Sequence, residues 1–332
     1  MTARLRIAIA GASNLRGKEV AELIEERMPS AEISLLDDAV AEGVLTEAGG
    51  EPVVIQGTDA QSFDETQFAF FTGTMEYTQR HWRQALQAGA TVIDLSGALR
   101  HEKDATQWIP ALRGKLGTPR ATGGKLLVAP SSPAIIACTL AAAFKDLSVQ
   151  RLAVVFFQPV SERGQAGIEE LETQSVNLLS LKPISKELYG TQVAFNILGG
   201  YGPEGGETLS AVRAEIMASV RAYLEGRAAA PAIQLVQAPV FYGYSFMAYA
   251  DFAAAPGEEQ LAEALSAVGV SVVEADAERP SSVTVAGESQ IFVAQAEADA
   301  ASAGGRWIWG AADNLRLSAA NAVSIAETLR AS

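Results

Sequence analysis

The first third of the chain alternates short β-rich segments with segments of helical spacing. Strands are predicted over residues 5–10, 33–36, 68–71 and 91–94. Apolar residues repeat with a helical period over 19–24 before Met28 and Pro29 end that helix, and 78–88 is a second predicted helix. Strands that alternate with helices pair in parallel, because each crossover returns the chain to the same edge of the sheet. This part is therefore predicted to be a doubly wound, Rossmann-type α/β domain for nucleotide binding.

From residue 151 the pattern becomes that of an α+β domain. Two long helices are predicted over 161–179 and about 207–224, with a glycine-rich loop at 198–206 between them. Strands are predicted over residues 152–157, 232–238, 240–252, 271–274, 283–285, 289–295 and 306–310. Because the runs at 232–238 and 240–252 adjoin without room for a crossover helix, we expect a mixed or antiparallel sheet. A last helix over 314–330 presents one apolar face.

The composition excludes several classes of protein. With 332 residues, 48% of them apolar, the chain is long enough for two domains with packed cores. Its net charge of −14 disfavours nucleic-acid and anionic-membrane partners, which require clustered cations, and no apolar run is long enough to span a bilayer. We therefore expect a cytoplasmic protein. One cysteine, Cys138, and two histidines, His81 and His101, predict neither a disulfide framework nor a metal site.

The turn after the first predicted strand is a candidate nucleotide site. Residues 11–17 read Gly-Ala-Ser-Asn-Leu-Arg-Gly, and such turns direct backbone N–H groups and a helix N-terminus at a pyrophosphate. The candidate cofactor-binding residues here are Gly11, Ser13, Asn14 and Gly17. Asn14 tolerates left-handed backbone angles, but its side chain is expected to intrude where the phosphate approaches. The alternative is that the turn only connects a strand to a helix.

Asp37 bears on the choice of cofactor. It lies at the end of the second predicted strand, about 20 residues beyond Gly17, where an acidic side chain accepts hydrogen bonds from an adenosine ribose. A carboxylate there repels a 2′-phosphate, so NAD is favoured over NADP if a nucleotide binds. The alternative is that Asp37 and Asp38 only solvate the end of the strand.

Several segments resemble motifs of the aspartate-semialdehyde dehydrogenase family in order and spacing, from Gly11 to Glu327. Residues 92–100 read Val-Ile-Asp-Leu-Ser-Gly-Ala-Leu-Arg, and 127–135 read Leu-Val-Ala-Pro-Ser-Ser-Pro-Ala-Ile. Residues 237–245 read Gln-Ala-Pro-Val-Phe-Tyr-Gly-Tyr-Ser. The resemblance implies a Rossmann-type NAD(P)-binding domain over 1–132 plus 314–332, and a dimerisation and substrate domain over 133–313. It also implies a homodimer formed through the sheet of the second domain.

The catalytic positions of the family carry other residues in this chain. The resemblance puts Ser132 at the nucleophilic cysteine, Tyr244 at the histidine base and Gln237 at the arginine that binds the substrate carboxylate. Serine requires an adjacent base that a thiol does not, and tyrosine is a poor base at neutral pH. The simpler interpretation of Tyr244 is packing in a strand. Cys138 lies in a helical apolar run and is interpreted as a buried small hydrophobe rather than a displaced nucleophile.

Other positions of the family site are kept. The resemblance puts Gln158 at the glutamine that orients the substrate and Arg100 at the arginine that holds its phosphate, with an ordinary surface arginine as the alternative for Arg100. Glu215 falls, in a loose alignment, at the substrate-binding glutamate, and Asn321 lies at a cofactor-side position of the closing helix. Glu162 is expected to crowd a nicotinamide pocket.

The chain is therefore identified as a member of the degenerate, USG-like branch of that family. The leading hypothesis is a dimeric relative, inactive or altered in catalysis, that keeps the fold and a residual nucleotide or metabolite pocket. One alternative is a working NAD(P)-dependent aspartate-semialdehyde dehydrogenase of amino-acid biosynthesis, which reductively dephosphorylates aspartyl phosphate. Another is a regulatory or scaffold subunit that pairs with a true dehydrogenase.

Overall fold

The computed structural model describes residues 5–38, 45–48, 51–59, 61–119 and 124–331. These residues form two compact units, which are described separately. The first contains the described residues up to Arg113, those between 117 and 131, and those from Ser318 onward. The second contains residues 114–116 and 132–317. Ser132 and residues 314–317 thus group with the second unit, whereas the sequence-based division assigned them to the first.

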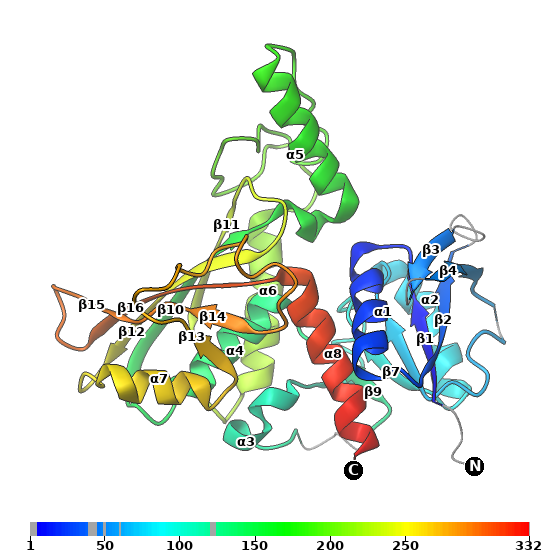
Figure 1. The fold of residues 1–332 in the computed structure, drawn as a ribbon, viewed down its shortest axis with the longest axis horizontal. Coiled ribbons are helices and arrows are strands. Elements are labelled where there is room, and N and C mark those ends of the chain that lie inside the picture. Colours follow the sequence, from blue (N-terminus) through cyan, green and yellow to red (C-terminus); the bar gives the residue numbers. More distant parts are fainter. Residues whose placement is uncertain (1–4, 39–44, 49–50, 60, 120–123, 332) are drawn as a thin grey trace. The chain divides into compact units, whose positions relative to one another are not determined.

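The first unit is built on a parallel seven-stranded sheet of order β5-β2-β1-β6-β7-β9-β8. Its strands are β1 (Arg6–Ala10), β2 (Glu32–Asp37), β5 (Gln56–Gly57), β6 (Phe68–Phe71), β7 (Thr91–Asp94), β8 (Thr106–Gln107) and β9 (Leu126–Val128). Helices α1 (Leu15–Arg27) and α2 (Met75–Gln87) connect strands of this sheet, and β3 (Leu45–Ala48) and β4 (Glu51–Val54) form a separate hairpin. The predicted doubly wound α/β domain is confirmed (Figure 1).

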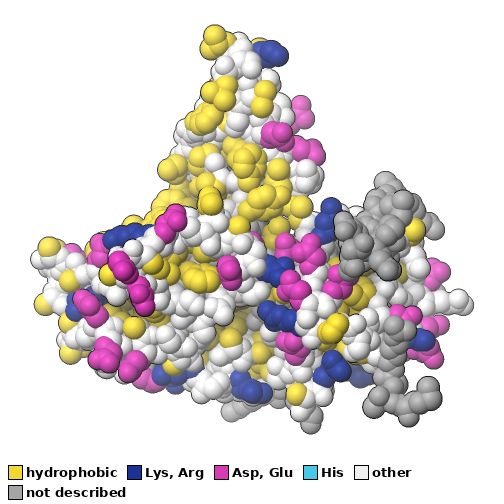
Figure 2. Space-filling view, viewed as in Figure 1, with side chains coloured by type: hydrophobic (Ala, Val, Ile, Leu, Met, Phe, Trp, Pro, Cys, Tyr) yellow, Lys and Arg dark blue, Asp and Glu magenta, His cyan; other side chains and the backbone are white. Residues whose placement is uncertain are grey.

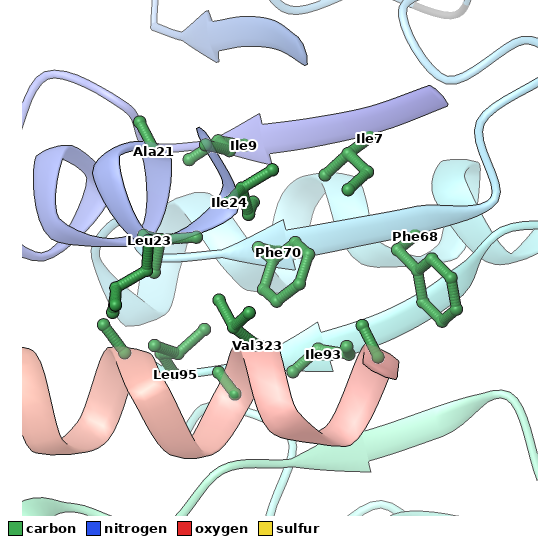
Figure 3. Packing of buried hydrophobic residues seen from close by; sticks show 14 of the residues in the cluster. Ile7, Ile9, Ala21, Leu23, Ile24, Phe68, Phe70, Ile93, Leu95 and Val323 are labelled. Carbon is green, nitrogen blue, oxygen red and sulfur yellow. The ribbon is translucent and has the colours of Figure 1, made fainter. Parts of the chain in front are cut away.

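Helix α8 (Asn314–Arg330) completes the core of the first unit. Its buried Ala322 and Val323 belong to the same apolar cluster as Ile24 of α1 and Phe70 and Ile93 of the sheet. Figure 3 shows Val323 on this helix beside Phe70 and Ile93. Burial of these side chains explains why the C-terminal segment returns to the N-terminal domain, because its apolar face would otherwise face water.

The second unit contains a mixed sheet of order β11-β10-β12-β16-β14-β13, with β15 beside β16. The strands are β10 (Val149–Gln158), β11 (Ala232–Gln237), β12 (Tyr244–Phe252), β13 (Val270–Val272), β14 (Ile291–Val293), β15 (Glu297–Ala298) and β16 (Gly305–Ala312). The pairs β10–β11 and β13–β14 are parallel and the others antiparallel, which confirms the predicted mixed sheet. The α-helices that the unit adds are α3 (Arg113–Leu116), α4 (Ser132–Phe144), α5 (Gly164–Leu179), α6 (Leu209–Leu224) and α7 (Glu258–Ser266).

The alternation of β10 and β12 explains which face of this sheet is covered. Leu152, Val154 and Phe156 are buried on one side of β10, and α4 packs against that strand. On β12, Phe246 and Ala248 are buried while Met247 between them is 36% exposed. One face of the sheet is thus a packed core, whereas the other face leaves apolar side chains partly open to solvent.

Two details of the second unit differ from the sequence-based expectation. Residues 283–285 form turns rather than a strand, and Val283 is 81% exposed, so its β-branched character does not reflect burial in a sheet. The predicted strand at 240–252 begins only at Tyr244, because Gly243 has a φ of +80° that interrupts the extended backbone. Among the described residues, no helix is long and apolar enough to cross a membrane.

Candidate functional site

The glycines of the turn after β1 are required by packing within the first unit. Gly11 has a φ of +90°, and a Cβ at this position would lie 2.2 Å from the backbone nitrogen of Gly73. A Cβ on Gly17 would lie 2.8 Å from the Cα of Ala12. Both distances are shorter than a side-chain carbon tolerates, so these glycines are needed by the fold whether or not a nucleotide binds.

Asn14 is the N-cap of α1, and its side chain is directed into the turn. Its Oδ1 accepts a hydrogen bond from the N–H of Gly17 at 2.9 Å, and its Nδ2 donates to the carbonyls of Gly11 at 2.7 Å and Thr72 at 2.8 Å. Its φ is −88°, so its tolerance of left-handed angles is not used. Asn14 therefore has a capping role that occupies one N–H of the first helical turn, and its intrusion into the path of a phosphate stays a prediction.

Asp37 binds the same turn from the end of β2. Its Oδ2 accepts a hydrogen bond from the backbone N–H of Ser13 at 2.8 Å, and its Oδ1 accepts one from the N–H of Asp38 at 2.8 Å. Asp38 in turn pairs with Arg80 at 2.9 Å. The carboxylate of Asp37 therefore orders the turn, and its role toward a ribose stays a prediction.

A buried carboxylate organises the loop that carries Arg100. Asp94 is completely buried and accepts hydrogen bonds from the N–H of Ser96 at 2.7 Å, from its hydroxyl at 2.6 Å and from the N–H of Leu99 at 2.9 Å. Burial raises the pKa of Asp94. Arg100, which is half-buried, donates from Nε to the carbonyl of Gly97 at 3.0 Å. The guanidinium therefore lies against the loop that carries Arg100.

Asn321 has a structural partner in the first unit. It is buried on α8, and its Nδ2 donates to the carbonyl of Trp108 at 3.1 Å. The bond links α8 to the loop that precedes the short 3₁₀ helix at Pro110–Leu112. A role of Asn321 toward a cofactor stays a prediction.

Ser132 begins α4 in the second unit and is bonded to Asn314. Its hydroxyl, which is 2% exposed, donates to the backbone carbonyl of Asn314 at 2.6 Å. The side chain of Asn314 accepts from the N–H of Gly243 at 2.8 Å and donates to Glu162 at 2.8 Å. Asn314 thus ties the start of α4 to the residue before Tyr244. Glu162, which was expected to crowd a nicotinamide, is a partner of Asn314.

Three predicted residues of the second unit, Gln158, Gln237 and Tyr244, lie together with Tyr201 in a second cluster, which we call the amide–tyrosine network. Gln158 donates from Nε2 to Gln237 Oε1 at 3.2 Å and to the hydroxyl of Tyr201 at 3.1 Å. That hydroxyl donates to Gln237 Oε1 at 2.8 Å. The hydroxyl of Tyr244 donates to Gln158 Oε1 at 3.3 Å. The four side chains therefore bond to one another.

Gln237 also bonds to the backbone on both sides of this network. Its Nε2 donates to the carbonyls of Gln158 at 2.9 Å and Ala238 at 3.0 Å, and its backbone pairs with Leu198. Gln158 and Gln237 are each at most 1% exposed. Because buried amide groups without partners are costly, this set of internal bonds is what permits the two glutamines to be buried.

Tyr201 and Asn314 were missed as members of the site. Tyr201 lies in the glycine-rich loop before α6, and burial raises its pKa to about 12 against the opposing charge of Arg163. Arg163 lies 5.7 Å from the ring of Tyr201 and pairs with Glu207 at 3.3 Å. A tyrosine among flexible glycines was the available signal in the sequence, whereas nothing local marked Asn314.

The remaining candidates lie apart from the network. Cys138 is completely buried on α4, and burial raises the pKa of its thiol, which agrees with its interpretation as a small hydrophobe. Glu215 is exposed on α6, and its substrate role stays a prediction. In the described part of the chain, no three His, Cys, Asp or Glu side chains are grouped to hold a metal ion.

The two units together define a class of protein, in which a Rossmann-type α/β domain is joined to a mixed-sheet domain with a buried polar cluster. Residues 6–116 match the NAD-binding domain of semialdehyde dehydrogenases, and residues 140–317 match their dimerisation domain. The chain belongs to the semialdehyde dehydrogenase family.

The similarity to individual members covers nearly the whole chain. A USG-1 protein homolog of Pseudomonas aeruginosa is 30% identical over 99% of this chain and 98% of its own. The structure of a probable aspartate-semialdehyde dehydrogenase from the same organism has a TM-score of 0.86, at 28% identity and 98% coverage of each chain. Aspartate-semialdehyde dehydrogenase II of Vibrio cholerae has a TM-score of 0.85, at 25% identity and 99% coverage of each chain.

Proposed function

We propose that this chain is a semialdehyde dehydrogenase homologue that does not perform the thiol-dependent reaction of its enzyme relatives. The observation that carries the proposal is the amide–tyrosine network. Its four side chains, Gln158 and the three that surround it, are neutral and bond to one another. A substrate carboxylate would have to break these bonds and would find no cation within the network to replace them.

The position assigned to the nucleophile supports the same proposal. The hydroxyl of Ser132 donates a hydrogen bond to a backbone carbonyl, and a carbonyl cannot act as a general base. Serine is a competent nucleophile only beside a group that removes its proton. The chain's thiol cannot replace it, because Cys138 is enclosed in the core and its raised pKa keeps it protonated. The site therefore lacks an activated nucleophile.

The first unit supports weak nucleotide binding with a preference for NAD. The N-terminus of α1 would face a pyrophosphate, although Asn14 and Asp37 already engage the N–H groups of Gly17 and Ser13. Asp37 would accept hydrogen bonds from a ribose 2′-hydroxyl and repel a 2′-phosphate. Arg80, the cation that pairs with Asp38, is neutralised by that pair. Bound NAD would supply hydride chemistry, and this chain's residues would only orient it.

A homodimer is part of the proposal and rests on apolar surface of the second unit. On its open sheet face, Met247 is 36% and Trp307 is 42% exposed. More apolar side chains are exposed on and after α5, including Leu179 and Leu181, and Figure 2 shows hydrophobic side chains gathered there. Exposed apolar side chains that gather on one part of a surface are typical of interaction sites. Sedimentation analysis is expected to give twice the monomer mass, and a monomer at micromolar concentration would contradict the assembly.

The catalytic part of the proposal is tested by assaying reductive dephosphorylation of aspartyl phosphate with saturating NADPH and, separately, NADH. No turnover above the blank is expected, whereas about 1 s⁻¹ or more would contradict the proposal. The triple variant Ser132→Cys, Tyr244→His, Gln237→Arg is expected to stay nearly inactive, because Asn14, Asp37 and Glu162 keep their present bonds. Robust activity from these three changes would show that the remaining pocket is intact.

Calorimetric titration separates the cofactor preference from catalysis. NAD is expected to bind more tightly than NADP. Asp37→Ser is expected to remove that preference, because it removes the carboxylate that repels the 2′-phosphate of NADP. Asp64→Ser, which removes a carboxylate at an exposed position of the first unit, serves as the control for the charge change. Tighter binding of NADP by the unmodified chain would contradict the predicted preference.

A further inference from the structure

A groove of about 660 Å³ lies at the opposite end of β10 from the amide–tyrosine network. It is lined by the end of α4, the first residues of β10 and the loop that follows α6. Gln158 is the last residue of β10 and Val149 the first, so at about 3.3 Å per residue the two sites are about 30 Å apart. The groove is therefore distinct from the family's site, and its volume is within the range of small-molecule pockets, roughly 300–1,000 Å³.

Three cations line this groove in a chain whose net charge is −14. Lys145 comes from the turn directly after α4, Arg151 from β10 and Arg227 from the loop after α6. One carboxylate among the lining residues, Asp146, is held by Lys115 at 2.7 Å and lies 3.7 Å from Lys145. These lysines keep the pKa of Asp146 low, the hydrogen bond from Lys115 being the larger cause. The groove thus has an excess of positive charge.

The two arginines have unused donors. The side chain of Arg151 is exposed, and its guanidinium makes no hydrogen bond or ion pair with any described residue. Asp251 lies opposite it in the β10–β12 register, but its carboxylate accepts a hydrogen bond from Ser302 at 3.3 Å instead. Arg227 is held over the ring of Tyr223 at 4.4 Å and donates to the carbonyl of that residue.

Arg227 also carries an enclosed donor without an acceptor. Its Nη1 is buried and has no hydrogen-bond partner among the described residues. Enclosed N–H groups without acceptors are rare in folded proteins, because each one loses its bonds to water without replacement. An acceptor that enters beside Arg227 would remove this deficit after a small rotation of the guanidinium. The apolar wall of Ala141, Val149 and Leu152 gives room for a carbon skeleton beside the charged group.

We propose that this groove binds a small phosphate-bearing anion between Arg151, Arg227 and Lys145. Guanidinium groups match phosphate oxygens in a bidentate geometry, and a lysine adds a compact point charge. A dianion compensates the cationic excess better than a single carboxylate does.

Binding is measured by ³¹P NMR titration of the full chain with inorganic phosphate and, in a second arm, with glycerol phosphate. Saturable binding of at least one is expected. Tighter binding of glycerol phosphate assigns the site to phosphate monoesters, and equal binding assigns it to free phosphate. Sodium chloride at matched ionic strength corrects for screening. The absence of saturable binding of both would overturn the proposal.

Two variants are expected to change the affinity for phosphate in opposite directions. A folding defect would only weaken binding, so it would not produce this pattern. Arg151→Gln is expected to weaken binding about tenfold, because it removes a charge-assisted donor. Asp146→Asn is expected to strengthen binding about threefold, because it frees Lys145. Arg330→Gln, an exposed position of the first unit, makes the same charge change as Arg151→Gln and is expected to leave binding unchanged. Equal effects of the two arginine changes would overturn the proposal.

Discussion

The turn after β1 and the amide–tyrosine network differ in how each departs from a binding site. The turn keeps two glycines of a nucleotide fingerprint, and both are required by contacts with Gly73 and Ala12. The network has neutral side chains at positions where the resemblance implies a cation and a base, and those side chains bond to one another. Retained motif residues therefore do not by themselves indicate a retained ligand, and replaced ones do not indicate an empty site.

The two regions also depend on different forces. Around Gly11 the constraint is backbone geometry, since a positive φ and a close approach of two chain segments leave no room for a side chain. Around Gln237 the constraint is the pairing of buried polar groups. Substitutions that act on only one of these forces test the comparison.

Gly11→Ala is expected to have the largest effect. The new Cβ would meet the backbone of Gly73 at 2.2 Å, and the residue would remain at a φ of +90°. Neither problem is relieved without a backbone shift, so the free energy of unfolding is expected to fall by about 3 kcal/mol or more. Urea denaturation followed by circular dichroism measures the change.

Gly114→Ala is the matched control for that substitution. This glycine is in the short helix α3, has no positive φ, and a Cβ there meets nothing within 4 Å. Alanine is expected to be neutral or to stabilise by about 0.5 kcal/mol. If Gly11→Ala were as mild as the control, the glycine would have to be explained by a ligand rather than by the fold.

Gln237→Leu is expected to have the next largest effect. It removes the acceptor of the Tyr201 hydroxyl and one of the two acceptors of Gln158 Nε2, and it takes a donor from the carbonyls of Gln158 and Ala238. A loss of about 2–4 kcal/mol is expected from these unpaired buried groups. Gln234→Leu, on the exposed side of the same strand, should change stability by less than about 0.5 kcal/mol. Equal stability of the two variants would show that the network is not closed.

The fold was largely predictable from the sequence because its signals are local. The helix at 314–330 and the strands at 68–71 and 91–94 have the predicted bounds, since each is a periodic apolar segment that is buried. The run at 283–285 misled because three residues with β-branched side chains are too short to distinguish a strand from a turn. Its exposed Val283 has no partner strand to bury it.

Three of the four members of the amide–tyrosine network were predicted from the sequence, but Tyr201 and the bonds within the network were not. Gln158, Gln237 and Tyr244 were found by resemblance to a family motif, and they do lie together. Tyr201 joins them from a distant loop, and Asn314 joins Ser132 across 182 positions of sequence. Such partners are set by tertiary packing, which no local pattern reports. The same limit applies to Asn14, whose Nδ2 donates to the carbonyl of Thr72 in a distant part of the sequence.

Alkaline pH is expected to give the smallest and most specific effect. When the unmodified chain is compared with Tyr201→Phe, the two chains differ only in the ionisation of Tyr201. Burial raises the pKa of Tyr201 from 10.0 to about 12, so the folded chain keeps a proton that the unfolded chain loses. The stability from this proton is fully present below pH 10 and is lost as the pH rises through 12. Tyr201→Phe cannot ionise, so its free energy of unfolding is expected to decline less between pH 9 and 11, as measured by urea denaturation at each pH.

Tyr77 and Tyr189 also have raised pKa values and remain in both chains, which is why the difference between the chains is the quantity to follow. Parallel declines would mean that the hydroxyl of Tyr201 is open to solvent, and the network would then be as accessible to a ligand as the turn after β1.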